Sequence, residues 1–441
     1  DGWSTLINCA SSHIYLKQMN RKCESALENG AEPVRVLSSV LGQNYPSDEL
    51  EYSWKKLMQN HPHDSICCCS VDEVQDEMAT RFNKSKQVAD YLVSEGKRYI
   101  ADKINTKEYE KYKNALPFVV FNTTGRERTS VVSVEIDVTR KSGWLKKCAY
   151  DLDEINVPNY KLIDSDGNSI PFKIEDLGVK FGYDLPKDKF RQPYMARRVR
   201  VTFEAENISA VGYKTYALVE GDTEKVTDTL VSSENCMEND AIRVEINKNG
   251  SLNVTDKASG RTYKGVAYYE ETGDLGNEYM YKMPEGSKAI TTQDTVAKIE
   301  LAEDEPYRAM YKITNTITVP KSGDDNFEDE KSHMVFFKER VGGRSNDTVE
   351  MKIETFVSLD KNGKGVKIKT RFDNEVKDHR VRIMVPTGIN SDVHKADSVF
   401  EVVTRNNRHN AGWNNPSACE HEQGFVSIDD GEKGIAVANI G

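Results

Sequence analysis

One short segment, residues 60–70, concentrates side chains that can take part in chemistry. It reads Asn-His-Pro-His-Asp-Ser-Ile-Cys-Cys-Cys-Ser and places His61, His63 and Asp64 just before three consecutive cysteines at positions 67–69. Imidazole, carboxylate and thiolate groups are donors through which proteins bind transition metals such as zinc. The spacing fits no standard zinc pattern such as Cys-x-x-Cys. Two interpretations therefore stay open: a metal-binding loop, and a polar loop whose cysteines pack as small apolar side chains.

Helical segments on both sides are expected to hold this loop. Ser47 is a suitable N-cap for a helix over residues 48–59, and Ser70 with Glu73 has the spacing of a capping box that starts the next helix. Apolar residues then recur at intervals of three, four or seven, which is typical of one face of a long helix. These residues are Val71, Val74, Met78, Phe82, Ala89, Leu92 and Tyr99.

Two further helices are predicted upstream of the loop. The first covers residues 11–27, with Gly30 as its stop, and the second covers residues 33–41, with Gly42 as its stop. The helical segments together predict a small bundle.

From Pro117 the sequence changes to the alternation of apolar and polar residues that is typical of strands. The clearest runs are residues 118–121, 131–136, 198–203 and 366–372. Turn-forming pairs separate such runs at Asp166-Gly167, Asn249-Gly250 and Asn362-Gly363. No alternation of strands with helices is visible, so antiparallel sheets are favoured over a parallel sheet.

The expected fold class is α+β. An N-terminal helical bundle over residues 1–112 is followed by a small antiparallel β-sandwich over residues 113–222. A large β-sandwich over residues 223–441, truncated at its C-terminus, completes the chain. The polar segment 219–234 is interpreted as a linker between the two β units.

The composition excludes several classes of protein. Lys and Arg number 60 against 71 Asp and Glu, and the resulting net charge of −11 argues against nucleic-acid binding. No apolar run approaches the roughly 18 residues that a membrane span needs. Eight cysteines in 441 residues are too few for a disulfide scaffold, which favours a reduced, cytoplasmic setting. The chain opens at Asp1 without a signal peptide and ends at Gly441 within a strand-like run, so we expect an internal piece of a longer protein.

The segment 60–74 closely resembles the histidine–aspartate loop of glycoside hydrolase family 38, the retaining α-mannosidases. The resemblance is greatest to the bacterial branch. Other stretches resemble landmarks of the same family, in the family's order and over nearly the whole chain. They are residues 15–18, 120–122, 210–216, 256–260, 273–279 and 378–382.

The resemblance implies a zinc ion that is held in part by His63, which matches a metal ligand of the family. Asp64 matches the residue that contacts the bound sugar beside the metal. Tyr279 is similar to the tyrosine that the β region contributes to the sugar pocket, with Asp274 and Glu278 as weaker neighbours. Considered alone, Asp274 and Glu278 would be interpreted as a solvated acidic loop.

One residue departs from the family pattern. Cys68 stands where the family usually has glycine. Glycine adopts a positive φ without penalty, whereas cysteine does so reluctantly, so the resemblance leaves the conformation of the loop open.

The resemblance further implies that the chain is part of an enzyme that hydrolyses α-mannosidic bonds in small oligosaccharides. The nucleophile, the acid/base carboxylate and the other zinc ligands would lie in an N-terminal catalytic domain before Asp1, since the chain contains no suitable His-x-Asp motif. The chain alone is then expected to be inactive.

Two alternatives accompany this interpretation. The chain could be a noncatalytic carbohydrate-binding or assembly module built from the same sandwiches. The three cysteines at positions 67–69 could instead serve a structural zinc site. The sequence leaves the oligomeric state open, with a homodimer as one option.

Overall fold

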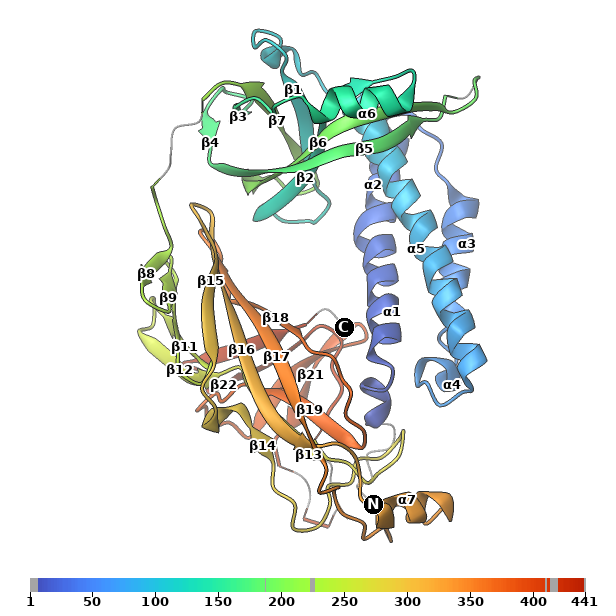
Figure 1. Cartoon of the computed structure of the whole chain (residues 1–441), viewed down its shortest axis with the longest axis vertical. Coiled ribbons are helices and arrows are strands. Elements are labelled where there is room, and N and C mark those ends of the chain that lie inside the picture. Colours follow the sequence, from blue (N-terminus) through green and yellow to red (C-terminus); the bar gives the residue numbers. More distant parts are fainter. Residues whose placement is uncertain (1–6, 187, 223–226, 409–410, 413–418, 440–441) are drawn as a thin grey trace.

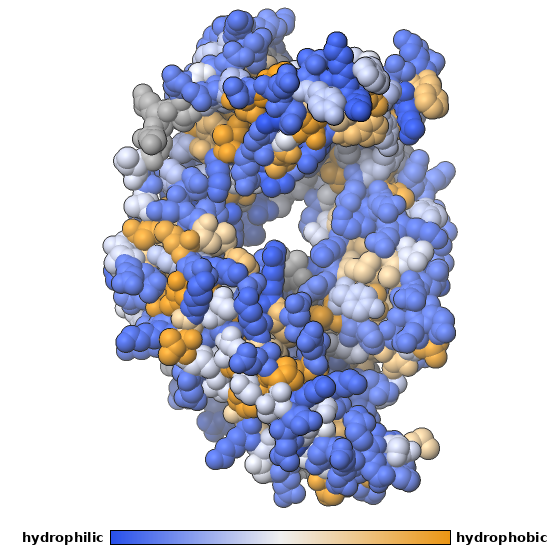
Figure 2. Space-filling model, in the orientation of Figure 1, coloured by the Kyte–Doolittle hydropathy of each residue, from blue (hydrophilic) through white to orange (hydrophobic). Residues whose placement is uncertain are grey.

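The computed structural model of the chain describes residues 7–186, 188–222, 227–408, 411–412 and 419–439. Helices run along one side of the molecule, a smaller β unit lies at one end and a larger β unit at the other (Figure 1). Figure 2 shows that hydrophilic residues cover most of this face and that an opening lies in its middle, enclosed by the helices and the two β units. The predicted order of a helical part followed by antiparallel sheets is confirmed.

The helical part surrounds one apolar core. Its helices are α1 (Ile14–Ala26), the π-helical turn η2 (Leu27–Ala31), α2 (Glu32–Val40), α3 (Ser47–Met58), α4 (His63–Ile66) and α5 (Asp72–Ala101), with short 3-10 turns η1 (Asn8–Ala10) and η3 (Lys107–Tyr109). The predicted stripe on the longest helix is buried at Met78, Phe82, Ala89 and Leu92, whereas Val71 is exposed. The other buried residues of this core are Leu16, Cys23, Leu27, Ala31, Leu50, Leu57 and Cys68.

The helix ends differ from the predictions in three places. Gly30 does not stop the first helix, because the chain continues through η2 into α2; a Cβ at Gly30 would lie 3.0 Å from a Val93 methyl group, so the glycine permits close packing on α5. The predicted caps Ser47 and Ser70 are also wrong. The N-cap positions are one residue away, at Pro46 and Val71, and neither helix has a side-chain cap.

Two antiparallel sheets form the smaller β unit. One has the order β1-β7-β3-β4 and the other the order β2-β6-β5. The strands are β1 (Leu116–Asn122), β2 (Arg128–Lys141), β3 (Tyr160–Asp164), β4 (Ser169–Ile170), β5 (Phe172–Asp184), β6 (Gln192–Ile208) and β7 (Gly212–Glu220), with helix α6 (Leu145–Asp153) packed on β6. Both sheets contribute to one core, in which Leu162 and Leu218 of the first meet Val201 and Phe203 of the second.

The larger β unit contains four further sheets among the described residues, ordered β12-β11-β10-β9-β8, β14-β13-β19, β15-β16-β17-β18 and β21-β20-β22-β23. Its first strands are β8 (Val231–Ser233), β9 (Cys236–Glu238), β10 (Ile242–Ile246), β11 (Leu252–Asp256), β12 (Arg261–Val266), β13 (Tyr268–Gly273), β14 (Ile290–Thr291) and β15 (Lys298–Glu305). The later strands are β16 (Arg308–Pro320), β17 (Thr348–Asp360), β18 (Lys367–Arg371), β19 (His379–Met384), β20 (Val393–Ser398), β21 (Glu401–Asn406), β22 (Phe425–Asp429) and β23 (Gly434–Ala438). A 3-10 turn η4 (Thr292–Asp294) and helix α7 (Asp325–Ser332) lie in the connections.

The predicted turns lie between paired strands of the structure, whereas the predicted linker differs from it in length. The three turn pairs join β3 to β4, β10 to β11 and β17 to β18. Gly167 and Gly250 take φ values of +90° and +84°, which a side chain would disfavour. The linker is shorter than predicted, because Val219 is buried in β7 and pairs with Lys161. Part of the predicted linker, residues 223–226, lies outside the described residues, as do Asp1 and Gly441.

Candidate functional site

His63 and Asp64 begin the four-residue helix α4, which lies between α3 and α5. So short a helix has no buried face, and its two first side chains are 87% and 67% exposed. The His63 Nε2 atom lies 3.3 Å from the Asp64 Oδ1 atom. The imidazole therefore faces solvent and is available to a metal ion or to another part of a protein.

The backbone of this loop turns sharply at Cys68. Cys68 takes φ +64°, the left-handed conformation that favours glycine, and its side chain is buried. The Lys17 Nζ atom lies 3.0 Å from the Cys68 Sγ atom. The contact joins α1 to the loop and helps to hold cysteine at a position where glycine would be less strained.

Tyr279 comes from a loop of the larger β unit that follows β13. Asn277 Oδ1 accepts hydrogen bonds from the backbone N–H groups of Tyr279 and Met280, at 3.0 and 2.9 Å, which shapes the loop as an Asx turn. The N-terminal turn η1 fixes the loop from the other side. The Asn8 backbone N–H donates to the Tyr279 carbonyl, and its side-chain amide donates to Asp274 Oδ2 at 2.8 Å.

Cys69 connects the two loops. Its Sγ atom lies 3.5 Å from Asp64 Oδ1, and its side chain is hydrogen-bonded to that of Tyr279. This hydrogen bond, together with loss of hydration and nearby negative groups, raises the pKa of Tyr279 to about 12. Tyr279 therefore keeps its proton at neutral pH and can donate a hydrogen bond. The structure thus brings together Asp64 and Tyr279, which are 215 positions apart in the sequence.

Asp274 and Glu278 lie in the same loop, but Asp274 is half-buried whereas Glu278 is exposed. Burial raises the pKa of Asp274, although its carboxylate accepts hydrogen bonds from the backbone N–H groups of Lys282 and Gly276. The Glu278 carbonyl accepts a hydrogen bond from the Cys9 thiol at 3.2 Å. Asp274 therefore organises the loop that carries Tyr279. The solvated acidic loop that the two residues would suggest alone describes the exposed Glu278 but not Asp274.

The sequence contained no local signal for two of the groups that build this region. Asn8 and Cys9 contact residues that are 266 to 269 positions further along the chain. The role of Cys69 was also missed, although its place five residues after Asp64 could have suggested a contact across one turn.

The potential metal donors of this region include His63 and Asp64, whose Nε2 and Oδ1 atoms lie 3.3 Å apart. Across the described parts of the chain, no group of three or more His, Cys, Asp or Glu side chains is arranged to hold a metal ion. The consecutive cysteines face different partners, since Cys67 contacts Cys9, Cys68 contacts Lys17 and Cys69 contacts Asp64. His63 can thus supply one ligand, and other polypeptide would have to supply the rest.

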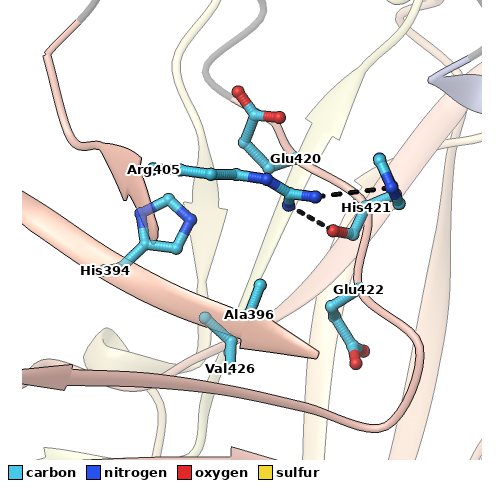
Figure 3. Close-up of a pocket in the computed structure, with 7 residues that line it drawn as sticks. All are labelled: His394, Ala396, Arg405, Glu420, His421, Glu422 and Val426. Carbon is cyan, nitrogen blue, oxygen red and sulfur yellow. Dashed lines mark hydrogen bonds between the residues drawn. The ribbon is translucent and has the colours of Figure 1, made fainter. Parts of the chain in front are cut away.

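A separate hollow of about 260 Å³ lies on the sheet β21-β20-β22-β23 (Figure 3). Its lining residues are His394, Ala396, Arg405, Glu420, His421, Glu422 and Val426. The Arg405 guanidinium donates to the His421 carbonyl and lies 3.3 Å from its Nε2 atom. The Arg405 guanidinium in this hollow is therefore already hydrogen-bonded within the protein. The hollow is a weaker candidate for a functional site than the loops around His63.

None of the helices that the described residues form combines the length and the apolar character that a bilayer span requires.

Comparison with known protein families matches almost the whole chain. Residues 4–100 match the alpha mannosidase middle domain, residues 113–220 match the glycosyl hydrolases family 38 C-terminal domain 1, and residues 237–441 match the glycosyl hydrolases family 38 C-terminal domain.

Individual relatives give the same result. A protein of Halalkalibacterium halodurans, named a putative mannosylglycerate hydrolase, is 38% identical over 100% of this chain and 50% of its own length. An alpha-mannosidase structure from Enterococcus faecalis V583 superposes with a TM-score of 0.96 at 39% identity, over 100% of this chain and 50% of its own. A second Enterococcus faecalis structure, of a protein in glycosyl hydrolase family 38, has a TM-score of 0.91 and 37% identity, over 98% and 51%. This chain therefore spans about half the length of the relatives that it matches.

Proposed function

Because the chain belongs to glycoside hydrolase family 38, of which it carries the middle and C-terminal domains, we propose that it forms part of a retaining α-mannosidase. The observation that carries the proposal is the exposed His63–Asp64 pair, which lies on a loop that Cys69 connects to Tyr279. The two loops together present an imidazole, a carboxylate and a phenol toward solvent or toward another domain.

His63 would be one ligand of a zinc ion. A neutral imidazole is a good zinc ligand, and the Asp64 carboxylate at 3.3 Å can accept a hydrogen bond from the ring or from a sugar hydroxyl. A zinc ion bound there would chelate adjacent sugar hydroxyls and polarise them. The exposure of His63 supports this role, because a buried ring could not be shared with another polypeptide.

Asp64 and Tyr279 would bind the sugar itself. An exposed carboxylate accepts hydrogen bonds from hydroxyl groups, and Tyr279, with its raised pKa, stays a donor. Asp274 would act indirectly by shaping the Tyr279 loop through its hydrogen bonds with Asn8 and Lys282.

The nucleophile and the acid/base carboxylate would come from polypeptide outside residues 1–441. Retaining glycosidases need two carboxyl groups about 5–5.5 Å apart on either side of the scissile bond. We therefore expect the chain alone to be inactive and the longer protein to be active.

The substrate class is an α-mannoside. One relative is named an alpha-mannosidase and another a mannosylglycerate hydrolase, so small mannosides with a neutral or a charged aglycone are both candidates. Assays of the longer protein on an aryl α-mannoside, an α-mannose disaccharide and mannosylglycerate separate these. Activity on none of them, with sugar binding retained, would favour the noncatalytic carbohydrate-binding or assembly module.

The decisive variant is His63→Ala in the longer protein, with His61→Ala as its matched control. Both histidines are exposed on the same loop, but His61 hydrogen-bonds to Asn20 at 2.8 Å. Loss of a direct ligand should lower zinc affinity by at least the roughly 10- to 100-fold seen for outer-shell partners, and turnover should fall with it. The His61 variant should keep both. Full zinc content and normal turnover in the His63 variant would refute the role of His63.

Several wider features belong to the same proposal. We interpret the helices as a bundle and the paired sheets as sandwiches, with domains at residues 1–112, 113–222 and 223–441. The described residues form no disulfide, which supports a reduced, cytoplasmic setting.

A further inference from the structure

The loop that carries Tyr279 is held by a second segment of the larger β unit. This segment, residues 333–347, connects helix α7 to β17, and its Arg340 side chain contacts the loop. The Arg340 Nη1 atom donates to the Leu275 carbonyl at 2.8 Å and also to the Gly276 carbonyl. One guanidinium nitrogen therefore binds the carbonyl groups of two successive residues shortly before Tyr279.

Lys282 makes the reverse connection, from the loop to the segment. Its Nζ atom donates to the carbonyls of Lys338 and Arg340, at 2.8 and 2.6 Å. Each of the two segments thus supplies one cation to backbone carbonyls of the other, an arrangement that we call the Arg340–Lys282 clasp. Hydrogen bonds from charged donors are about twice as strong as those between neutral groups, so the clasp binds the loop more firmly than ordinary backbone contacts would.

The position of Arg340 is set by its own side of the clasp. Its Nε atom donates to the Val335 carbonyl at 3.0 Å, and its guanidinium carbon lies 5.5 Å from the ring centroid of Phe327. Phe327 belongs to α7 and is 1% exposed. The next backbone N–H along the chain, that of Val341, donates to the buried Glu330 carboxylate at 2.7 Å. The guanidinium is therefore held in place by contacts that do not involve the loop.

The loop itself is a compact turn, in which the backbone touches itself. A Cβ atom added at Gly276 would lie 1.6 Å from the Met280 carbonyl oxygen, so only glycine permits this close approach. The Asn277 N–H donates to the same Met280 carbonyl at 3.0 Å. Tyr279 lies within this turn, and its position therefore follows that of Gly276, whose carbonyl Arg340 binds.

We propose that Arg340 is a positioning residue that sets the place of Tyr279 in the sugar site. The inference rests on the proposed function, in which the Tyr279 hydroxyl binds the sugar. Arg340 acts through the loop and does not itself touch the sugar, because its Nη1 and Nε atoms donate to carbonyls within the protein. Without the guanidinium, the turn can move relative to α7 and Tyr279 moves with it. A displacement of about 1 Å in such a group can lower a rate by up to about 100-fold.

The first test measures backbone hydrogen exchange in the 441-residue chain, where neither metal nor substrate is needed. Arg340→Ala should raise exchange at the hydrogen-bonded amides of residues 276–282 by about tenfold or more, since bonds from a charged group are lost and the turn opens more easily. The matched control is Arg261→Ala. The Arg261 Nη2 atom also donates to two successive carbonyls, those of Thr387 and Gly388 at 3.3 Å, and its loss should leave the loop unchanged. Unchanged exchange in Arg340→Ala would overturn the proposal.

The second test is a double-mutant cycle in the longer protein, with an aryl α-mannoside as substrate. It compares kcat/KM for Arg340→Ala, for Tyr279→Ala and for the double variant. Arg340→Ala alone should lower kcat/KM by about fivefold or more, roughly the value of one lost hydrogen bond. In the Tyr279→Ala background the same change should lower kcat/KM by less than about twofold, because the group through which Arg340 acts is already absent. Arg261→Ala should leave kcat/KM unchanged in both backgrounds.

The cycle separates failure of this inference from failure of the proposed function. A merely structural role of Arg340 would reduce the folded fraction and lower kcat/KM by the same factor in both backgrounds, which would overturn the positioning role. Unchanged kcat/KM in Tyr279→Ala would instead refute the sugar contact of Tyr279, and with it the functional part of the inference, whereas the exchange result would stand. Circular dichroism checks that each variant is folded. If Arg340→Ala does not fold, Lys282→Met tests the clasp from its other side and should give the same pattern.

Discussion

The left-handed backbone at Cys68 allows a quantitative test of the histidine–aspartate loop. A Cβ atom at φ +64° costs about 1–2 kcal/mol relative to glycine. Glycine in turn loses about 0.4–1 kcal/mol through the greater freedom of the unfolded chain. The Cys68→Gly variant should therefore be more stable than Cys68→Ala by about 0.5–1 kcal/mol. Alanine is the proper reference, since both variants lose the thiol and its contact with Lys17.

The neighbouring Cys67 is the matched control. Its φ of −71° and ψ of −18° lie in the helical region, where glycine is less stable than alanine by about 0.5–1 kcal/mol. The order of the two variants should therefore reverse between adjacent positions.

Urea unfolding followed by circular dichroism at 222 nm reports on the helical part of the chain. The urea midpoint of Cys68→Gly should lie above that of Cys68→Ala, whereas the midpoint of Cys67→Gly should lie below that of Cys67→Ala. The slope of unfolding free energy against urea concentration should not change. The same order at both positions would refute the left-handed conformation at Cys68.

Two other predictions concern stability away from this loop. Hydrogen bonds from Lys312 and Lys352 lower the pKa of Glu354 to about 2. The stabilising contribution of the ionised carboxylate is therefore complete above the ordinary pKa near 4.5 and is lost as the pH falls toward 2. Glu354→Gln should flatten the fall in melting temperature over that pH range, and an unchanged profile would contradict this prediction. In Gly96→Ala, the new Cβ would lie 2.6 Å from a Val34 methyl group. Overpacking should cost about 1–3 kcal/mol of stability, which exceeds the roughly 1 kcal/mol that alanine gains in helix propensity. Its melting temperature should fall, and a rise would show that α2 and α5 can separate without cost.

The periodic parts of the fold were predictable from the sequence because each depends on neighbours along the chain. Met78 and Phe82 lie one helical turn apart, and both are buried in the same core. Asn249-Gly250 forms its turn through local backbone geometry. Such signals need only a few adjacent residues.

The helix caps were not predictable to the residue. Ser70 has the right spacing for a capping box, but the backbone leaves the helix at Val71 and the Gln75 side chain donates to the Ser70 carbonyl at 2.9 Å. The Gln75 side chain thus bonds to the backbone ahead of the helix, in place of the capping box, whose preference has a modest energy.

The candidate site was predictable only in part. His63 and Asp64 stand in a recognisable motif, and their exposure follows from the shortness of α4. The contacts of Asn8 and Cys9 with the Tyr279 loop join segments more than 260 positions apart. No periodicity or spacing encodes such contacts, which arise only when the chain folds.

The most direct test of the central claim is anomalous diffraction at the zinc edge from crystals of the longer protein. We expect one zinc peak at about 2.0–2.1 Å from a ring nitrogen of His63, with the remaining ligands from polypeptide outside this chain. A zinc peak away from this loop, with the His63 ring still surrounded by solvent, would contradict the account.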